Sequence, residues 1–166
     1  MRARALGGLA ILAVLVADQA AKLAVARYFA EGGEPFAIGP LLDFTLRWNR
    51  GVSFSLLAQN TDAGRWLLLA LTLAMTALLA FWLWRTRALL TGLGLGAVVG
   101  GALGNACDRL TYGAVVDYLD LHALGRHFFV FNLADAAINL GVALLIVDGL
   151  VVATRPTAPG ASGGAK

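Results

Sequence analysis

Long apolar runs dominate the pattern of hydrophobic and polar positions, and they divide the chain into alternating spans and connections. The runs cover residues 5–29, 63–84, 88–109 and 128–154. A helix needs about 20 apolar residues to cross a hydrocarbon core about 30 Å thick. The pattern therefore predicts a membrane α-helical fold, a bundle of four transmembrane helices.

The first run could be mistaken for a cleaved signal peptide, because Arg2 and Arg4 precede it. The apolar stretch does not stop at the length typical of a signal sequence. It continues through Asp18, Gln19 and Lys22 to Phe29. We therefore predict a first helix that is retained.

The connection between the first two helices follows a different period. Pro35 and Gly39-Pro40 indicate turns. From residue 42 apolar and polar positions alternate, so the two sets should face opposite sides of a strand. The apolar set is Leu42, Phe44, Leu46 and Trp48, and the polar set is Asp43, Thr45, Arg47 and Asn49. This predicts an amphipathic strand, a turn at 49–51 and a returning strand over 52–57. We expect a small extracytoplasmic β-sheet cradle over about 34–60, lying on the bilayer surface or covering a cleft between helices.

Composition agrees with a membrane protein. Hydrophobic residues make up 59% of the chain and charged residues 14%, with a mean hydropathy of +0.75. The net charge is +3, but the arginines form no basic stripe, so we expect no nucleic-acid partner. Residues 1–154 are expected to form a single integral-membrane domain, followed by a disordered cytoplasmic tail over 155–166.

Two further patterns concern packing and orientation. Gly96, Gly100 and Gly104 recur every four residues, which lets a neighbouring helix approach closely. An even number of spans puts both termini on one side. Compact basic clusters precede the first span and lie at 85–87, between the second and third, and they favour a cytoplasmic side for both termini.

Ionisable groups gather at one depth of this bundle. Asp18 and Lys22 are four residues apart and can neutralise each other, most simply as a pair that tethers the first helix. Counting about 1.5 Å per residue from the helix ends brings Asp18, Asp108 and Asp135 to one outer level. Asp117, on the short piece between the third and fourth helices, should lie at the same level. Asn132, Asp135 and Asn139 should share one face, which we expect to look into the bundle.

Paired carboxylates at the hydrocarbon edge suit an aspartic hydrolase, in which one ionised acid activates water while a neutral partner polarises the scissile carbonyl. Proton-coupled transporters and ion-conducting bundles also place acids in helices, so this alternative stays open. A relay should distribute acids through the membrane, whereas Asp148 alone lies near the inner face. Asp43 and Asp120 are expected to be solvated surface groups.

The sequence gives no indication of a cofactor or metal. Cys107, His122 and His127 lack the paired spacing of zinc ligands, and a single cysteine cannot form an internal disulfide. We expect Cys107 to be a small side chain packed in a helix.

Five ordered blocks resemble the bacterial lipoprotein signal peptidases, also called signal peptidase II. They are Asp18-Gln-Ala-Ala-Lys22, Asn49-Arg-Gly51-Val-Ser-Phe54, Gly100-Gly-Ala-Leu-Gly-Asn105-Ala-Cys-Asp108-Arg109, Val116-Asp117-Tyr118 and Phe131-Asn132-Leu-Ala-Asp135. The resemblance covers all four helices. Two small departures are Ala21, where the family often has Ser or Thr, and Tyr118, where Phe is common.

The resemblance implies an intramembrane aspartic endopeptidase with Asp117 and Asp135 as its catalytic pair. Asn105 and Arg109 would hold the substrate backbone, and Asn132 would support the pair. Asp18, Lys22, Asn49 and Asp108 match polar positions that shape the site. From the residues themselves, Arg109 could instead pair with the neighbouring Asp108.

The substrates implied by this resemblance are diacylglyceryl-modified prolipoproteins, which the family cleaves before the lipidated cysteine to release the signal peptide. The expected location is the bacterial inner membrane, with the active site near the outer face. Membrane lipid is an expected partner, and the chain is expected to be a monomer.

Overall fold

The computed structural model describes residues 1–51 and 62–154 of the chain. Its elements run in the order α1 (Arg2–Ala30), β1 (Phe36–Gly39), β2 (Leu42–Asn49), α2 (Asp62–Arg85), α3 (Leu89–Tyr112), β3 (Val115–Ala123), β4 (Arg126–Phe131) and α4 (Leu133–Ala153). The predicted returning strand over 52–57 and the predicted tail over 155–166 lie outside the described residues.

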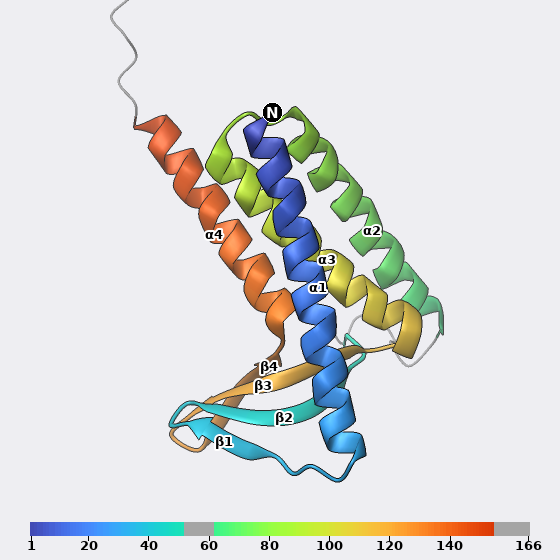
Figure 1. Cartoon of the computed structure of the whole chain (residues 1–166). Helices are drawn as coiled ribbons and strands as arrows, with labels where there is room; N and C mark the ends of the chain where they lie inside the picture. The colour runs from blue at the N-terminus through green and yellow to red at the C-terminus, as the bar shows by residue number, and fades with distance from the viewer. Residues whose placement is uncertain (52–61, 155–166) are drawn as a thin grey trace, which may run out of the picture.

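The helices form a bundle in which α3 is central (Figure 1). All four are long and apolar enough to span a membrane, as predicted. In the most apolar stretch of α3, 72% of the residues are buried, against 17% in α1, 17% in α2 and 6% in α4. The outer three helices therefore keep most of their apolar side chains available for lipid, while α3 supplies the contacts that join them.

Glycines on α3 allow this central position, as the four-residue repeat predicted. A Cβ added to Gly92 would lie 2.6 Å from the backbone oxygen of Ala3, and one added to Gly100 would lie 2.8 Å from that of Ile11. On another face, a Cβ at Gly101 would lie 2.5 Å from the backbone oxygen of Ala134 in α4. Backbones this close leave no room for side chains, so α3 holds α1 and α4 by direct backbone packing.

The four strands form one antiparallel sheet in the order β1-β2-β3-β4, at the end of the bundle opposite the N-terminus (Figure 1). Our prediction placed the whole sheet between the first two helices, which is wrong. Half of its strands come from the segment between α3 and α4. The predicted start of the fourth helix at residue 128 is also wrong, because Phe128–Phe131 pairs with β3 as part of β4 and α4 begins at Leu133.

The predicted alternation along β2 is interrupted. The register against β3 shifts between Phe44 and Arg47, so side chains before and after this point do not keep the same alternation. Arg47 is the Cα partner of Asp117, whereas Asp43 is the partner of Asp120. The part of β2 beside Asp117 therefore has a different register from the part that pairs with residues 119–121 of β3.

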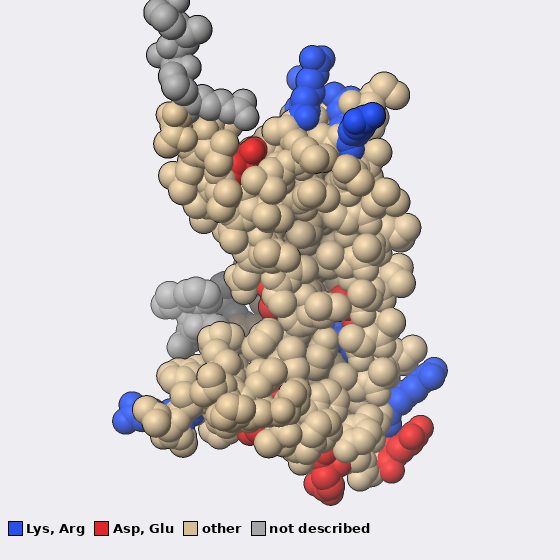
Figure 2. Space-filling model, turned by 60° about the vertical axis from the view of Figure 1, so that its left-hand side comes forward, with Lys and Arg blue, Asp and Glu red and all other residues tan. Residues whose placement is uncertain are grey.

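Charged side chains lie mainly at the two ends of the molecule (Figure 2). Basic side chains gather at the end that holds the N-terminus, and acidic and basic ones at the end that holds the sheet. Between them the visible surface is uncharged apart from one acidic group near the upper end and a few atoms inside a recess. This distribution fits a bundle whose middle lies in hydrocarbon.

Close packing on α3 predicts that Gly100→Ala will destabilise the protein. The new Cβ would meet the backbone of Ile11, and overpacking of this kind costs about 1–3 kcal/mol. Thermal unfolding of the purified protein in detergent should show a clear fall in Tm. The matched control is Gly8→Ala on α1, where an added Cβ has no atom of the described chain within 4 Å. Equal Tm values for the two variants would contradict the packing argument.

Candidate active site

The first turn of α4 is organised by its own side chains. Asn132 is the N-cap, and its Oδ1 accepts from the backbone N–H of Asp135 at 2.9 Å. Asp135 Oδ2 in turn accepts from the backbone N–H of Asn132 at 3.3 Å, which completes a capping box. The capping box therefore fixes the orientation of the Asp135 carboxylate from within α4 itself. The sequence places an acid at the N-terminal end of the helix, where the helix dipole favours negative charge.

Asp117 lies on β3 with its carboxylate held between two amides. Asn132 Nδ2 donates to Asp117 Oδ1 at 2.7 Å, and Asn49 Nδ2 donates to Asp117 Oδ2 at 2.9 Å. The Asn49 side chain is itself fixed, because its Oδ1 accepts from the backbone N–H of Gly51 at 2.8 Å. Asp117 is 2% exposed and Asn132 is fully buried. Side chains at the end of β2 and at the N-cap of α4 thus both donate hydrogen bonds to the carboxylate of Asp117.

Asn105 on α3 joins the two acids. Its Nδ2 donates to Asp135 Oδ1 at 2.8 Å, and its Oδ1 accepts from Asn132 Nδ2 at 3.2 Å. The result is a continuous chain of hydrogen bonds, Asp117–Asn132–Asn105–Asp135, that runs across β3, α4 and α3. The structure therefore brings both predicted acids together with the three predicted amides Asn49, Asn105 and Asn132.

Behind this chain lies a buried ammonium group. Lys22 Nζ is 2.8 Å from Asp18 Oδ2 and 2.9 Å from Asp108 Oδ2, and it donates to Asn105 Oδ1 at 2.9 Å. Gln19 Nε2 also donates to Asp108 Oδ1 at 3.0 Å. Lys22 is 3% exposed and the two acids 0% and 1%. The predicted pair of Asp18 and Lys22 is confirmed, and a second acid joins it.

The same two acids also bind backbone groups that position the site. Asp18 Oδ1 accepts from the backbone N–H of Ala134 at 2.9 Å, so α1 caps the first turn of α4. Asp108 Oδ2 accepts from the backbone N–H of Val116 at 3.0 Å, directly before Asp117. Lys22 and its partners therefore fix the segments that carry both candidate acids.

Burial raises the pKa of Asp117 to about 6. The hydrogen bond from Asn49 opposes this change, and the charge of Asp135 adds to it. A carboxyl group of this kind can hold a proton near neutral pH and can release it with little cost. Within the described residues, no group of three His, Cys, Asp or Glu side chains is arranged to hold a metal ion.

Asp117 also forms part of the wall of a cavity of about 360 Å³ at the sheet. The other lining residues come from the end of β2 and from β4: Arg47, Trp48, Asn49, Phe128, Phe129 and Val130. The cavity combines aromatic side chains with the polar side chains of Arg47 and Asn49 and one buried carboxylate. Its size and mixed lining suit part of a peptide.

The comparisons with known proteins agree with this geometry. The family model described as "Signal peptidase (SPase) II" matches residues 10–151. The chain belongs to the signal peptidase II family. It is therefore a protease.

Two curated relatives are similar over most of their length. A lipoprotein signal peptidase of Methylobacterium radiotolerans is 49% identical over 147 residues, which are 87% of this chain and 85% of the relative. One of Methylocella silvestris is 46% identical and covers 99% of this chain and 96% of the relative.

Solved structures with the same fold include two bacterial membrane enzymes. One has a TM-score of 0.71 at 27% identity, covering 87% of this chain and 92% of that enzyme. The other has a TM-score of 0.75 at 24% identity and covers 94% of each chain.

Two other predicted positions of this signal peptidase II chain differ from expectation, and an alternative left open for a third does not hold. Arg109 forms no described ion pair with Asp108, which binds Lys22 instead; Arg109 Nη1 donates to the backbone oxygen of Asn105 at 3.2 Å. Asp120 is 4% exposed and pairs with His127, so it is not a solvated surface group. Asn139 is exposed rather than turned into the bundle.

Two contributors were not singled out from the sequence as site residues. Gln19 could have been found because it lies inside the first block of the resemblance and contacts both Asp18 and Asp108. Arg65 gave no such signal. Its Nε and Nη2 donate to the backbone oxygens of Arg109 and Leu110, each at 2.8 Å, and so bind the carboxyl end of α3.

The buried cluster predicts that Lys22→Met will destabilise this signal peptidase II severely. The substitution leaves Asp18 and Asp108 buried without their counterion, and breaking a buried pair in this way costs about 3–5 kcal/mol. Thermal unfolding in detergent measures the loss. Arg126→Met, which removes an exposed cation from β4, is the control and should unfold like the wild type. Similar Tm values for both variants would mean that the cluster contributes little.

Proposed function

We propose that the chain removes signal peptides from prolipoproteins as an aspartic endopeptidase, with Asp117 and Asp135 as its catalytic pair. Membership of the signal peptidase II family supports the reaction, and the similar curated proteins are named lipoprotein signal peptidases. The observation that carries the assignment of the residues is the hydrogen-bonded chain that joins Asp117 to Asp135 through Asn132 and Asn105.

In the proposed reaction the pair shares one proton. The ionised carboxylate takes a proton from a water molecule, whose oxygen attacks the scissile carbonyl carbon, while the neutral acid donates its proton to the carbonyl oxygen. The tetrahedral intermediate then collapses. Its C–N bond breaks as the leaving nitrogen takes the proton that came from water. One hydroxyl of the intermediate returns a proton to the other acid, so the carbonyl re-forms in the new carboxyl group and the pair again holds one proton. Asn49, Asn132 and Asn105 keep the carboxylates oriented throughout.

Asn105 and Arg109 would serve different roles, one holding the catalytic pair and the other binding the substrate. Asn105 uses both ends of its side chain within the protein, which supports a role in holding the pair rather than the substrate. Arg109 is partly exposed and has one described hydrogen bond, so it retains donors for substrate carbonyl groups. The cavity beside Asp117 would hold residues next to the scissile bond.

The distribution of charge supports a site that opens on one side of the membrane. Between Asp135 and Asp148, α4 has no ionisable side chain, and Asp148 accepts a hydrogen bond from Thr91 at the other end of the bundle. This leaves no ladder of acids across the membrane of the kind that a proton relay needs.

The chain is a multi-pass protein of the bacterial inner membrane, according to its four apolar helices and its family. We further place both termini in the cytoplasm and the pair near the outer face, because the basic end of the bundle should remain inside (Figure 2). A diacylglyceryl-modified substrate could then reach the pair by diffusing in the bilayer and be cut before its lipidated cysteine. Residues 1–154 would act as one monomeric peptidase domain, with 155–166 as a cytoplasmic tail.

Each acid of the pair should be essential, and the two should act as a unit. Asp117→Asn and Asp135→Asn should each remove nearly all cleavage of a lipidated prolipoprotein, and the double variant should be scarcely worse than either. Cleavage rates at matched amounts of folded enzyme test this. Asp43→Asn is the control, because this acid pairs with His122 at the other side of the register shift. Substantial turnover by either single variant would refute the assignment, and inactive wild-type protein would refute the proposed reaction itself.

The raised pKa of Asp117 predicts the pH dependence. As the pH rises through about 6, the pair loses the proton that the reaction needs, so the rate should fall. Asp135, Lys22 and Arg109 are the other described charges that act on Asp117. The hydrogen bond from Asn49 favours the ionised carboxylate and lowers the pKa, so Asn49→Ala should move the alkaline limb to higher pH.

The measurement is the rate of cleavage of lipidated substrate across a pH series. The position of the alkaline limb is compared between variants, whatever their maximal rates. Asp43→Asn should leave the limb where it lies in the wild type. A limb that stays in place or moves to lower pH in Asn49→Ala would contradict the role given to this hydrogen bond.

A further inference from the structure

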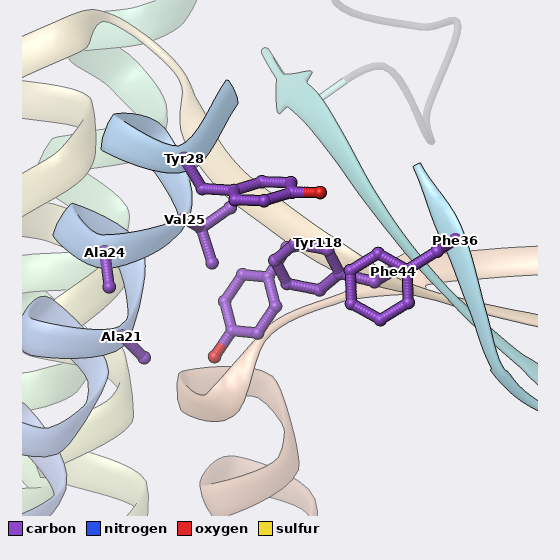
Figure 3. Close-up of a pocket in the computed structure, with 7 residues that line it drawn as sticks. All are labelled: Ala21, Ala24, Val25, Tyr28, Phe36, Phe44 and Tyr118. Carbon is purple, nitrogen blue, oxygen red and sulfur yellow. The ribbon is translucent and has the colours of Figure 1, made fainter. Parts of the chain in front are cut away.

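A second cavity lies where the outer end of α1 meets the sheet (Figure 3). Its volume is about 470 Å³, and its lining comes from α1, β1, β2 and β3: Ala21, Ala24, Val25, Tyr28, Phe36, Phe44 and Tyr118. Aromatic rings join the two sides, with Tyr28 and Phe36 at 5.7 Å and 5.0 Å from Phe44 between ring centroids. The cavity is thus built into the joint between the bundle and the sheet.

The lining of this cavity has few polar side-chain atoms, which are the hydroxyls of Tyr28 and Tyr118. The Tyr28 hydroxyl donates to the backbone oxygen of Glu34 at 3.0 Å, and Tyr118 is 7% exposed. What remains is alkyl and aromatic carbon. Such a cavity gives water too few partners, so an apolar ligand should fill it.

The position of the cavity relative to the bilayer indicates which apolar ligand can reach it. Ala21 and Tyr28 lie roughly 29 Å and 39 Å along α1 from Arg2, at about 1.5 Å per residue. A hydrocarbon core about 30 Å thick therefore ends near this cavity. Its opening lies where the acyl chains of the outer leaflet meet their glycerol and phosphate groups.

A cation lies at the matching height. Arg27 is in the last turn of α1, three residues after Ala24, so the two side chains are neighbours on the helix surface. Arg27 is exposed and has no ion pair with any residue in the described part of the chain. A guanidinium in this position suits a lipid phosphate.

The cavity is separate from the catalytic pair. Asp117 and Tyr118 are consecutive residues of β3, and consecutive side chains point to opposite faces of a strand. Asp117 lines the cavity of about 360 Å³ beside β4, whereas Tyr118 lines the apolar cavity beside α1. The strand thus stands between the reacting groups and the apolar cavity, which favours a membrane lipid over the substrate as occupant.

We propose that this cavity binds one acyl chain of an outer-leaflet phospholipid, whose phosphate is held by Arg27. The bound chain fills the space between α1 and the sheet and stabilises their contact. Loss of this lipid would loosen the sheet that carries Asp117. The inference rests on the membrane orientation given under the proposed function, but not on the identity of the catalytic pair.

Photolabelling by a phospholipid tests the site. The full-length protein is placed in bilayers that contain phosphatidylglycerol with a diazirine on one acyl chain, and labelled residues are mapped by mass spectrometry after illumination. Tyr118 is the diagnostic residue, because it is 7% exposed and bulk lipid has little access to it. We expect labelling of Tyr118 and of α1 residues 21–28. An unlabelled Tyr118 would overturn the proposal.

A variant that fills the cavity should displace the chain. Ala24→Leu adds bulk at the lining, and at about 0.8 kcal/mol per buried CH₂, exclusion of two methylenes lowers lipid affinity about 15-fold. Labelling of Tyr118 should fall accordingly. Ala13→Leu, an exposed change on α1 outside the lining, should label like the wild type. Equal labelling of Tyr118 in Ala24→Leu and the wild type would overturn the site. Arg27→Gln keeps the cavity intact and should reduce Tyr118 labelling by phosphatidylglycerol, so unchanged labelling would refute the role of the phosphate.

Competition distinguishes the two possible sources of an acyl chain. Excess unlabelled lipidated prolipoprotein is added to Asp117→Asn protein, which should bind the substrate without cutting it. Persistent labelling of Tyr118 by the phospholipid supports a resident membrane lipid. Loss of that labelling would assign the cavity to the acyl chain of the substrate and overturn our choice of occupant. Labelling itself needs no proteolysis, and a gel of the same sample shows whether the Asp117→Asn protein leaves the substrate uncut, so failure here and failure of the proposed function can be told apart.

Discussion

The buried ammonium group of Lys22 is the constraint on which the site depends. It lies between carboxylates from α1 and α3, and each of these carboxylates also accepts a backbone N–H from a segment that carries a candidate acid. In a medium of low dielectric such groups are costly alone and strongly attracted together. The cluster also fixes position, because neither α4 nor β3 can shift without removing a backbone N–H from a buried carboxylate.

Backbone packing makes this cluster possible. Gly104 has no side chain, and a Cβ there would overlap the carboxylate of Asp18. The stripe of small residues that draws α1 onto α3 therefore also leaves room for the acid that caps α4. Gly104 therefore serves both helix packing and the polar cluster. This explains why the glycine repeat of α3 continues directly into the polar residues of the site.

The four helices could be predicted because each needs a long apolar segment, which is visible in the sequence. The four spans and the predicted depth of Asp18, Asp108 and Asp135 followed from segment length and rise per residue. The last two strands could not be separated in this way, because Phe128–Phe131 continues directly into the apolar run of α4. Asn132 with Asp135 three residues later was the available signal for the true start of that helix.

Individual contacts within the candidate site were harder to foresee. Asp108 and Arg109 are adjacent in sequence, but side chains of consecutive helical residues point in different directions, and Asp108 turns to Lys22. Asp120 is buried because β4 and His127 cover it, and β4 was itself not predicted. Spacing along one element thus located the groups, whereas their partners depended on pairings between elements.

The length of α4 has a consequence for where cleavage occurs. Its 21 residues span roughly 32 Å, close to the thickness of a hydrocarbon core, so hydrophobic matching holds its first turn at the membrane boundary. Asp135 lies in that turn and moves with it. Under the proposed function, lipid thickness and protein contacts together would set the height at which the substrate is cut.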